Sequence, residues 1–233
     1  MRKKPAFNID QAAVWTPTLE HPWTGPLKQY KKAFTRDGLV DLFPSNGITI
    51  ADIGCGPSKF VARPQDRVIG VDHASCPGVD IVIDLSQGKL PFEDVSLDFV
   101  YCSHFIEHIT HSQRDCLMFE ARRTLKPGGL MFIKVPHYCH YWRAAYDHIV
   151  CTYGACTAYA LANASWYSKA IPFFHVIGVG LNYRVLGFTK ATLLTRVINR
   201  LLNLSHRISE MYLGYLLGGI EEVQYLLMKP VAE

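Results

Sequence analysis

The segment Ile48-Thr-Ile-Ala-Asp-Ile-Gly-Cys-Gly-Pro-Ser58 sets the architecture of this chain. Its apolar run is typical of a buried strand, and the glycines that end it allow a sharp turn and a close approach of the backbone to a ligand. A dinucleotide-binding fingerprint would need a third glycine where Lys59 stands. The carboxylate of Asp52 repels a pyrophosphate and attracts an ammonium group. The segment therefore favours a positively charged ligand over a dinucleotide.

Apolar runs of strand length recur along the chain, separated by stretches that suit helices or loops. Such spacing predicts a parallel sheet with both faces covered. A helix over about 113–125 ends at a Lys-Pro-Gly-Gly stop, and an amphipathic helix is expected over 193–208. The prediction is an α/β, Rossmann-like, doubly wound, mostly parallel sheet with an antiparallel C-terminal edge pair. The expected strands cover 48–53, 67–72, 79–84, 97–104, 130–136, 173–188 and 222–230.

The domain organisation follows from composition. Residues 1–47, rich in proline, aromatic residues and lysine, are expected to form an N-terminal cap with a helix around 27–42. Residues 48–233 form the main domain, in which the aromatic, histidine-rich segment 137–170 is an insertion over the active-site end of the sheet. The segment between Gly56 and Arg67 is short, so any helix in this first crossover must be brief.

Two further acidic residues end predicted strands. Asp72 stands twenty residues after Asp52 and ends the second strand, where it can accept hydrogen bonds from ribose hydroxyls. Asp84 ends the third strand, where a carboxylate can accept from an exocyclic amine. The alternative for Asp84 is a structural role as the cap of the next turn.

These residues, together with LPFEDVSLDFVYCSHFIEHI (90–109) and LKPGGLMFIKVP (125–136), resemble the class I S-adenosylmethionine-dependent methyltransferases. Within that group the chain resembles most the small-domain branch associated with polysaccharide biosynthesis. The resemblance implies S-adenosylmethionine as the cofactor. It also implies that Asp52, Gly54 and Gly56 hold the methionine part, Asp72 the ribose, Asp84 and the Leu85 backbone the adenine, and that Ser103 and His104 lie near the sulfonium. The sequence departs from the group at Ser58, where a third glycine is frequent.

Histidines supply the candidates for catalysis. His104 and His108 share a face if HFIEH begins a helix, and a neutral imidazole there can remove a hydroxyl proton. The alternative is that this segment only shapes the cofactor pocket. His137 follows the fifth strand and is a candidate for acceptor contact or base work, as are Tyr138, His140, Asp147 and His148, unless they belong to an ordinary surface loop.

A structural metal site is not expected. The seven cysteines form no CxxC pair, and a zinc site at His137, Cys139 and His140 lacks the usual paired spacing. Reduced thiols and a basic start with no apolar segment after it favour a cytoplasmic protein without a secretory signal. The longest charge-free stretch, 149–168, is too polar for a membrane span.

Charge is unevenly distributed and bears on partners. Residues 48–100 hold eight acidic and four basic residues, a net charge of −4, which leaves +8 for the rest of a chain whose total is +4. An acidic region suits a cationic cofactor, and a basic remainder suits an anionic acceptor or surface. The helix at 193–208 allows weak membrane-surface contact, although packing of its apolar stripe on the sheet is the favoured interpretation.

The sequence thus predicts methyl transfer, chiefly O-methylation, to a small-molecule or sugar acceptor. One alternative is a non-catalytic, methyltransferase-like binding module. Another is an RNA methyltransferase, although no aromatic-interleaved basic motif supports nucleic-acid binding.

Overall fold

The computed structural model describes residues 36–84, 88–140, 145–149, 152–155, 157–163, 174–183, 193–214 and 219–231. Most of the proposed N-terminal cap, 1–47, and much of the proposed insertion, 137–170, therefore lie outside the described residues, and both domain boundaries stay predictions. The described part of the expected 27–42 helix is α1, Arg36–Val40.

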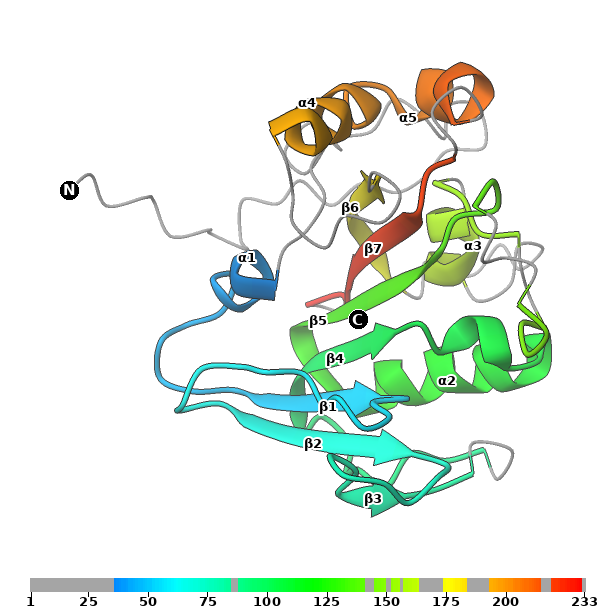
Figure 1. The fold of residues 1–233 in the computed structure, drawn as a ribbon. Coiled ribbons are helices and arrows are strands. Elements are labelled where there is room, and N and C mark those ends of the chain that lie inside the picture. Colours follow the sequence, from blue (N-terminus) through cyan, green and yellow to red (C-terminus); the bar gives the residue numbers. More distant parts are fainter. Residues whose placement is uncertain are drawn as a thin grey trace.

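One seven-stranded sheet organises the molecule, in the order β3-β2-β1-β4-β5-β7-β6. The first five strands of this order are parallel, and β7 pairs antiparallel with both β5 and β6. The predicted mixed sheet is confirmed, and Figure 1 shows β1, β2 and β4 ending at the same edge. The strands are β1 (Thr49–Ile53), β2 (Arg67–Asp72), β3 (Ile81–Val82), β4 (Leu97–Ser103), β5 (Leu125–Pro136), β6 (His175–Asn182) and β7 (Glu222–Met228).

Both faces of the sheet are buried, as a parallel sheet requires. Alternating residues of β5 separate the two cores: Met131 and Ile133 pack with α2 (His111–Thr124) and α3 (Thr157–Asn163), whereas Leu130 and Phe132 pack with α1. On this second face an aromatic cluster packs beside α1, with Tyr101 stacked on Phe132 at 5.5 Å between ring centroids. Burial on both sides fixes the register of the strands, and so the positions at which they end.

Local sequence signals set the limits of α2. Thr110 caps its start in a capping box with Gln113, whose backbone N–H donates to the Thr110 hydroxyl. The helix ends at Thr124, close to the predicted end, and β5 starts at once with Leu125. Pro127 explains this stop because the residue before a proline avoids helical conformation. The Lys-Pro-Gly-Gly sequence thus lies in the first part of β5.

The first crossover differs from the expectation. Residues 54–66, all of them described, form turns and loops without a helix, so the predicted brief helix is absent. Buried hydrogen bonds hold the loop instead: Asp52 accepts from the N–H of Phe60, and Asp66 pairs with Arg63 at 2.9 Å. Pro57 and Pro64 cannot donate the backbone bonds of a helix interior, which explains the loop.

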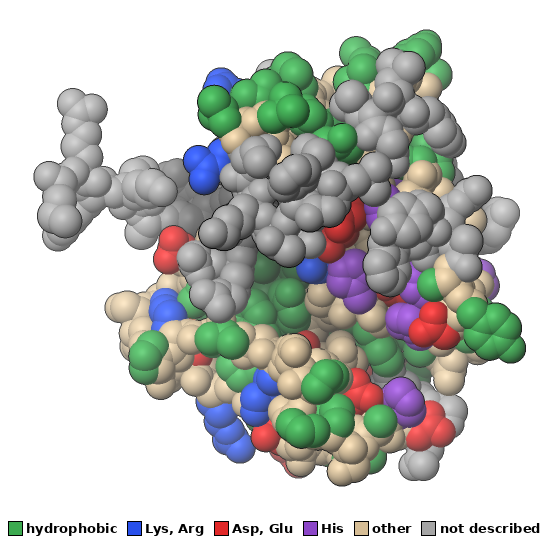
Figure 2. Space-filling view, viewed as in Figure 1, with side chains coloured by type: hydrophobic (Ala, Val, Ile, Leu, Met, Phe, Trp, Pro, Cys, Tyr) green, Lys and Arg blue, Asp and Glu red, His purple; other side chains and the backbone are tan. Residues whose placement is uncertain are grey.

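The C-terminal helices do not pack as expected, with their apolar stripe against the sheet. The predicted 193–208 helix is present as α4 (Leu193–Leu202) and α5 (His206–Ile208), followed by η6 (Ser209–Leu213). Most of its apolar stripe, however, faces outward beside its arginines, whereas Ile198 packs against the core and Thr195, Leu202 and Asn203 are buried. Figure 2 shows these apolar side chains gathered over α4 and α5. The exposed residues are Leu193, Leu194, Val197, Leu201, Leu204, Ile208, Met211 and Tyr212.

No helix among the described residues has the length and apolar character needed to cross a bilayer.

Candidate functional site

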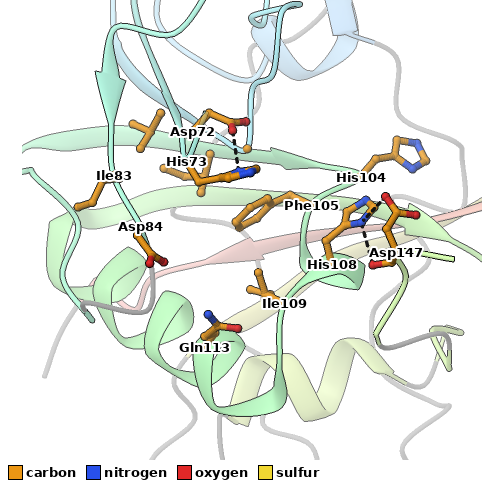
Figure 3. Close-up of a pocket in the computed structure, with 13 residues that line it drawn as sticks. Asp72, His73, Ile83, Asp84, His104, Phe105, His108, Ile109, Gln113 and Asp147 are labelled. Carbon is orange, nitrogen blue, oxygen red and sulfur yellow. Dashed lines mark hydrogen bonds and ion pairs between the residues drawn. The ribbon is translucent and has the colours of Figure 1, made fainter. Parts of the chain in front are cut away.

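A cavity of about 710 Å³ opens at the carboxyl ends of the parallel strands. This is the edge at which open α/β sheets bind ligands. Residues from β1, β2 and the segment after β3 form one wall, and the segment after β4 forms the other (Figure 3). Among the described residues, the cavity is lined by Ile53, Gly54, Val71, Asp72, His73, Ile83, Asp84, His104, Phe105, His108, Ile109, Gln113 and Asp147.

The glycine turn after β1 lies at this first cavity, where Gly54 belongs to the lining and Gly56 does not. Gly54 has φ +71°, and a Cβ there would lie 2.3 Å from the ring of Phe105, so only glycine fits. Gly56 has φ +52°, and a Cβ there would meet nothing within 4 Å. One glycine thus lets the Phe105 ring approach, and the other leaves open space beside the backbone. This is the shape that a closely approaching ligand needs.

Asp72 is held by backbone groups at the end of β2. Its Oδ2 accepts from Gly56 N–H at 2.9 Å, and its Oδ1 accepts from Ala74 N–H at 3.1 Å. Burial alone would raise the pKa of Asp72, but the N–H groups of Ala74 and Gly56 outweigh burial and lower that pKa. The carboxylate stays ionised and keeps lone pairs available for hydroxyl donors.

Asp52 lies beside the cavity rather than in its lining. Its side chain is buried among the residues of the second face, and its Oδ2 accepts from Phe60 N–H at 2.6 Å. Burial raises the pKa of Asp52 to about 6, although the Phe60 N–H and Lys59 act in the opposite direction. The contact organises the loop that carries both glycines, so the structure gives Asp52 a positioning role.

The remaining candidate cofactor residues fall in three places. Asp84 lines the first cavity opposite Asp72 (Figure 3), two residues beyond the end of β3. Leu85 lies outside the described residues. Ser103 ends β4, and its side chain hydrogen-bonds with that of Tyr101, on the aromatic face of the sheet. The geometry therefore joins Gly54, Asp72 and Asp84 around one cavity and turns Ser103 away from it.

His104 is held in a strained conformation by two carboxylates. Its φ is +53°, a conformation that costs a non-glycine residue about 1–3 kcal/mol. Its Nε2 lies 2.9 Å from Oε1 of Glu222, and its Nδ1 lies 3.3 Å from Oε1 of Glu107. Burial would lower the pKa of His104, but these two carboxylates outweigh burial and raise it to about 9. Both ring nitrogens of His104 thus face carboxylates, so neither is available to take a proton from another molecule.

A second cavity, of about 400 Å³, adjoins the first. The two cavities share His104, His108 and Asp147 in their linings. The Nδ1 of His108 lies 3.2 Å from Oδ2 of Asp147, an ion pair drawn in Figure 3. Histidine and acidic side chains gather in this part of the surface in Figure 2. The other described lining residues are Glu107, Pro136, His140, Ala145, His148, Glu221 and Glu222.

His137 lies away from both linings. Its side chain is fully buried, with Nε2 2.8 Å from Oε1 of Glu210 and Nδ1 2.9 Å from Sγ of Cys139. Burial would lower the pKa of His137, but the contacts with Cys139 and Glu210 outweigh burial and raise it. The geometry favours a structural role, in which His137 joins the end of β5 to η6.

Sequence reasoning missed the acidic partners of these histidines. Glu222, the partner of His104, begins β7 and stands 118 residues after it in the sequence. Glu210, the partner of His137, lies in η6 and stands 73 residues after it. Only the antiparallel insertion of β7 beside β5 brings Glu222 to the site, since Pro136 pairs with Glu222 in that ladder. The one signal in the sequence was an acidic residue at the start of a strongly apolar strand.

Comparison with known proteins agrees with this architecture. The family model described as "Methyltransferase domain" matches residues 51–133. A ubiquinone biosynthesis O-methyltransferase of Sinorhizobium fredii is 27% identical over 150 residues, which cover 54% of this chain and 60% of the relative. A probable tRNA methyltransferase 9B of Bos taurus is 34% identical over 98 residues, covering 38% of this chain and 21% of that protein. The chain thus spans less than two thirds of these curated relatives.

Solved structures show the same fold. An S-adenosylmethionine-dependent methyltransferase of Methanosarcina mazei superposes with a TM-score of 0.54 at 14% identity, covering 83% of this chain and 98% of that chain. At this identity the match establishes the fold alone.

Proposed function

We propose that this chain, whose residues 51–133 match a methyltransferase-domain model and whose fold is that of a solved S-adenosylmethionine-dependent methyltransferase, transfers a methyl group to a small-molecule or sugar acceptor, chiefly at oxygen. One observation carries the proposal: two adjoining cavities share His104, His108 and Asp147, and one of them has the glycine turn and acidic strand ends of a nucleoside site. A cofactor in the first cavity and an acceptor in the second would meet at the shared residues.

The residues of the first cavity fit the cofactor. The open space beside Gly56 admits the methionine part, and the ionised carboxylate of Asp72 suits the ribose hydroxyls. Asp84 lies where it can face the adenine, with the backbone of Leu85 as a further candidate. Phe105, packed against Gly54, supplies an apolar surface between these groups. Asp52 supports the turn from behind through its contact with Phe60.

The bound cofactor supplies a methyl group on a positively charged sulfur, so transfer forms a carbon–oxygen bond, breaks a carbon–sulfur bond and leaves S-adenosylhomocysteine. The chain mainly positions the two reactants and excludes water. The acceptor hydroxyl must also lose its proton. Between the two candidate bases, the contacts favour His108, because both ring nitrogens of His104 face carboxylates. His104 then acts as a fixed positive group that holds Glu222 and Glu107.

The proposed acceptor is a hydroxylated small molecule, a sugar or a glycan. O-methylation is supported by the ubiquinone O-methyltransferases among the relatives, and a sugar or glycan acceptor by the resemblance to methyltransferases of polysaccharide biosynthesis. The tRNA methyltransferase relatives keep RNA as the alternative acceptor, and a non-catalytic binding module is the third possibility.

A methyl-transfer assay tests this proposal. The purified chain is incubated with cofactor labelled in the methyl group and, separately, with nucleotide sugars, phenolic quinone precursors and total RNA. We expect label in the small-molecule pools, and less of it with His108→Ala at unchanged cofactor affinity. Label found only in RNA, with binding that weakens as salt rises, would support the RNA alternative. Cofactor binding with no transfer to any pool would support the binding module.

Contact with a membrane surface is a separate proposal, supported by the exposed stripe on α4 and α5. Three exposed arginines (Arg196, Arg200 and Arg207) flank its apolar side chains, the pattern of an interfacial helix on anionic lipid. We expect the chain to sediment with vesicles containing phosphatidylserine and a Leu194→Asp, Leu201→Asp double variant to stay in solution. Equal sedimentation of the two proteins would exclude this role for the stripe.

A cytoplasmic location stays a prediction, which fractionation of cells can test.

A further inference from the structure

The second cavity contains a cluster of side chains that can hold a metal ion. Glu107, His108 and His148 each offer one ligand atom, and these atoms all lie within 4.8 Å of one another. Glu107 and His108 lie in the short helix η4 (Ile106–His108), and His148 comes from the segment 145–149, whose Ile149 N–H donates to the carbonyl oxygen of Glu107 at 2.7 Å. We propose that these three residues bind a divalent transition-metal ion in the acceptor cavity.

Glu107 is the strongest reason for this assignment. Its side chain is 1% exposed, and its Oε2 has no hydrogen-bond partner among the described residues. Its one ion pair among the described residues is with His104, at 3.3 Å from Oε1. A buried carboxylate oxygen without a hydrogen bond is costly, and native proteins satisfy nearly all such groups. Because Glu107 also lines the cavity, a cation there would satisfy it.

The two histidines are arranged as metal ligands often are. The Nδ1 of His108 lies 3.2 Å from Oδ2 and 3.3 Å from the carbonyl oxygen of Asp147. In metal sites, ligating histidines commonly have one ring nitrogen held by a carboxylate or carbonyl while the other binds the ion. The rings of His108 and His148 meet edge to face, with centroids 4.8 Å apart. One short segment thus supplies a ligand, His148, and the orienting group, Asp147.

The charge of the cavity favours a cation. Four carboxylates line it, those of Glu107, Asp147, Glu221 and Glu222, and no lysine or arginine belongs to its described lining. His104 also lines the cavity and pairs with both Glu107 and Glu222, and Lys134 pairs with Glu222. Two imidazoles and one carboxylate suit zinc, iron or cobalt in the divalent state and leave coordination positions open.

This site deepens the proposed function and rests on it in one respect. The cavity shares His108 with the proposed cofactor cavity, so an ion bound there would lie near the point of transfer. An acceptor hydroxyl in an open coordination position would have its pKa lowered by the ion. The hydroxyl could then lose its proton to solvent without His108, here a metal ligand, acting as a free base. Hydroxylated acceptors able to coordinate a metal, such as sugars or catechols, are the substrate class that such a site selects.

Cobalt titration of the metal-free protein, without cofactor or acceptor, tests the site. Co²⁺ is chosen because its visible absorption reports binding and distinguishes nitrogen and oxygen ligands from thiolates. We expect one Co²⁺ per chain without thiolate bands. Affinity should fall at least tenfold in Glu107→Gln and in His148→Ala, since removal of even an outer-shell partner costs about 10–100-fold. The matched controls are Glu93→Gln and His111→Ala, whose side chains are exposed elsewhere, and both should bind as the wild type does.

Three outcomes would overturn the inference: no cobalt binding by the wild type, equal binding by both site variants, or thiolate bands that place the ion on cysteines. If Glu107→Gln fails to fold by circular dichroism, His148→Ala decides, because His148 lies in a loop. Binding of Co²⁺ is measured without methyl transfer, so its failure leaves the proposed function standing. Absence of transfer with intact Co²⁺ binding would instead remove the function and keep the site.

Discussion

The two halves of the sheet stabilise their charged groups in different ways. In the parallel half, Asp52 and Asp72 accept hydrogen bonds from backbone N–H groups of nearby residues, Phe60 and Gly56. In the antiparallel half, Glu222 contacts the side chains of His104, Lys134 and Asn182, which come from three different segments. The contacts of Asp52 and Asp72 lie within one stretch of chain, residues 52–72. The contacts of Glu222 join segments far apart in the sequence, so they form only when the whole sheet has formed.

This difference separates the two cavities, one formed by each kind of contact. A glycine turn with carboxylates held by backbone groups gives a preformed cavity, which binds the cofactor under the proposed function. The side-chain network that links β4, β5, β6 and β7 shapes the second cavity, which binds the acceptor under the same proposal. The first cavity should therefore be sensitive to changes in backbone shape, and the second to loss of charge.

The largest expected effect is at Gly54. A Gly54→Ala variant places a methyl group 2.3 Å from the Phe105 ring, so the turn or the ring must move, and cofactor affinity should fall more than tenfold. Gly128→Ala is the matched control, because Gly128 in β5 has a similar φ of +75°, its added methyl group would meet only Val231 at 3.6 Å, and it lies outside the cavity lining, so it adds only the cost of a positive φ, about 1–2 kcal/mol. Calorimetric titration with S-adenosylmethionine measures both. Equal loss in the two variants would mean that Phe105 does not define the turn.

The same contrast explains what the sequence could predict. The glycine turn, the acidic residues at or just after the ends of β2 and β3 and the end of α2 are local, and each was predicted from neighbouring residues. The antiparallel pair was predicted as well. Glu222 as the partner of His104, the burial of His137 against Glu210 and the outward stripe of α4 depend on contacts across the sheet, which periodicity does not encode. The loop in place of the first crossover helix could have been predicted from Pro57 and Pro64, whereas the hydrogen bond from Phe60 N–H to Asp52 that stabilises the loop could not.

The second effect concerns Glu222. Glu222→Ala leaves His104 and Lys134 without their shared carboxylate, and we expect the free energy of unfolding to fall by about 1–3 kcal/mol, since His104 is partly exposed and screened by solvent. Glu222→Gln keeps the shape and should cost less. Urea denaturation followed by circular dichroism measures both, with the exposed Glu93→Ala as the control. A loss no greater than that of the control would show that the network contributes nothing to stability.

The third effect is the pH dependence that Asp52 imposes. Its pKa is about 6 in the folded chain and about 4 in an unfolded one, so between these values the native state binds more protons than the unfolded state. The free energy of unfolding should therefore fall as pH rises from about 4 to about 6, by about 1–3 kcal/mol, and stay lower above that range. Asp52→Asn, which keeps an acceptor for Phe60, should remove this fall. Denaturation at pH 4.5 and 7.5 measures it, with Asp115→Asn as the control, and an unchanged pH dependence in Asp52→Asn would refute the assignment.

The most direct test of the cofactor cavity is calorimetric titration of S-adenosylmethionine into the wild type, Asp72→Ala and Asp115→Ala. Asp115 makes the control because its side chain is half-exposed on α2 and belongs to the lining of neither cavity. We expect one cofactor per wild-type chain, the same affinity in Asp115→Ala, and an affinity about tenfold to a hundredfold lower in Asp72→Ala, the loss of a charged hydrogen-bond acceptor. Binding that Asp72→Ala leaves unchanged, or no binding by the wild type, would contradict the placement of the cofactor at the ends of β1, β2 and β3.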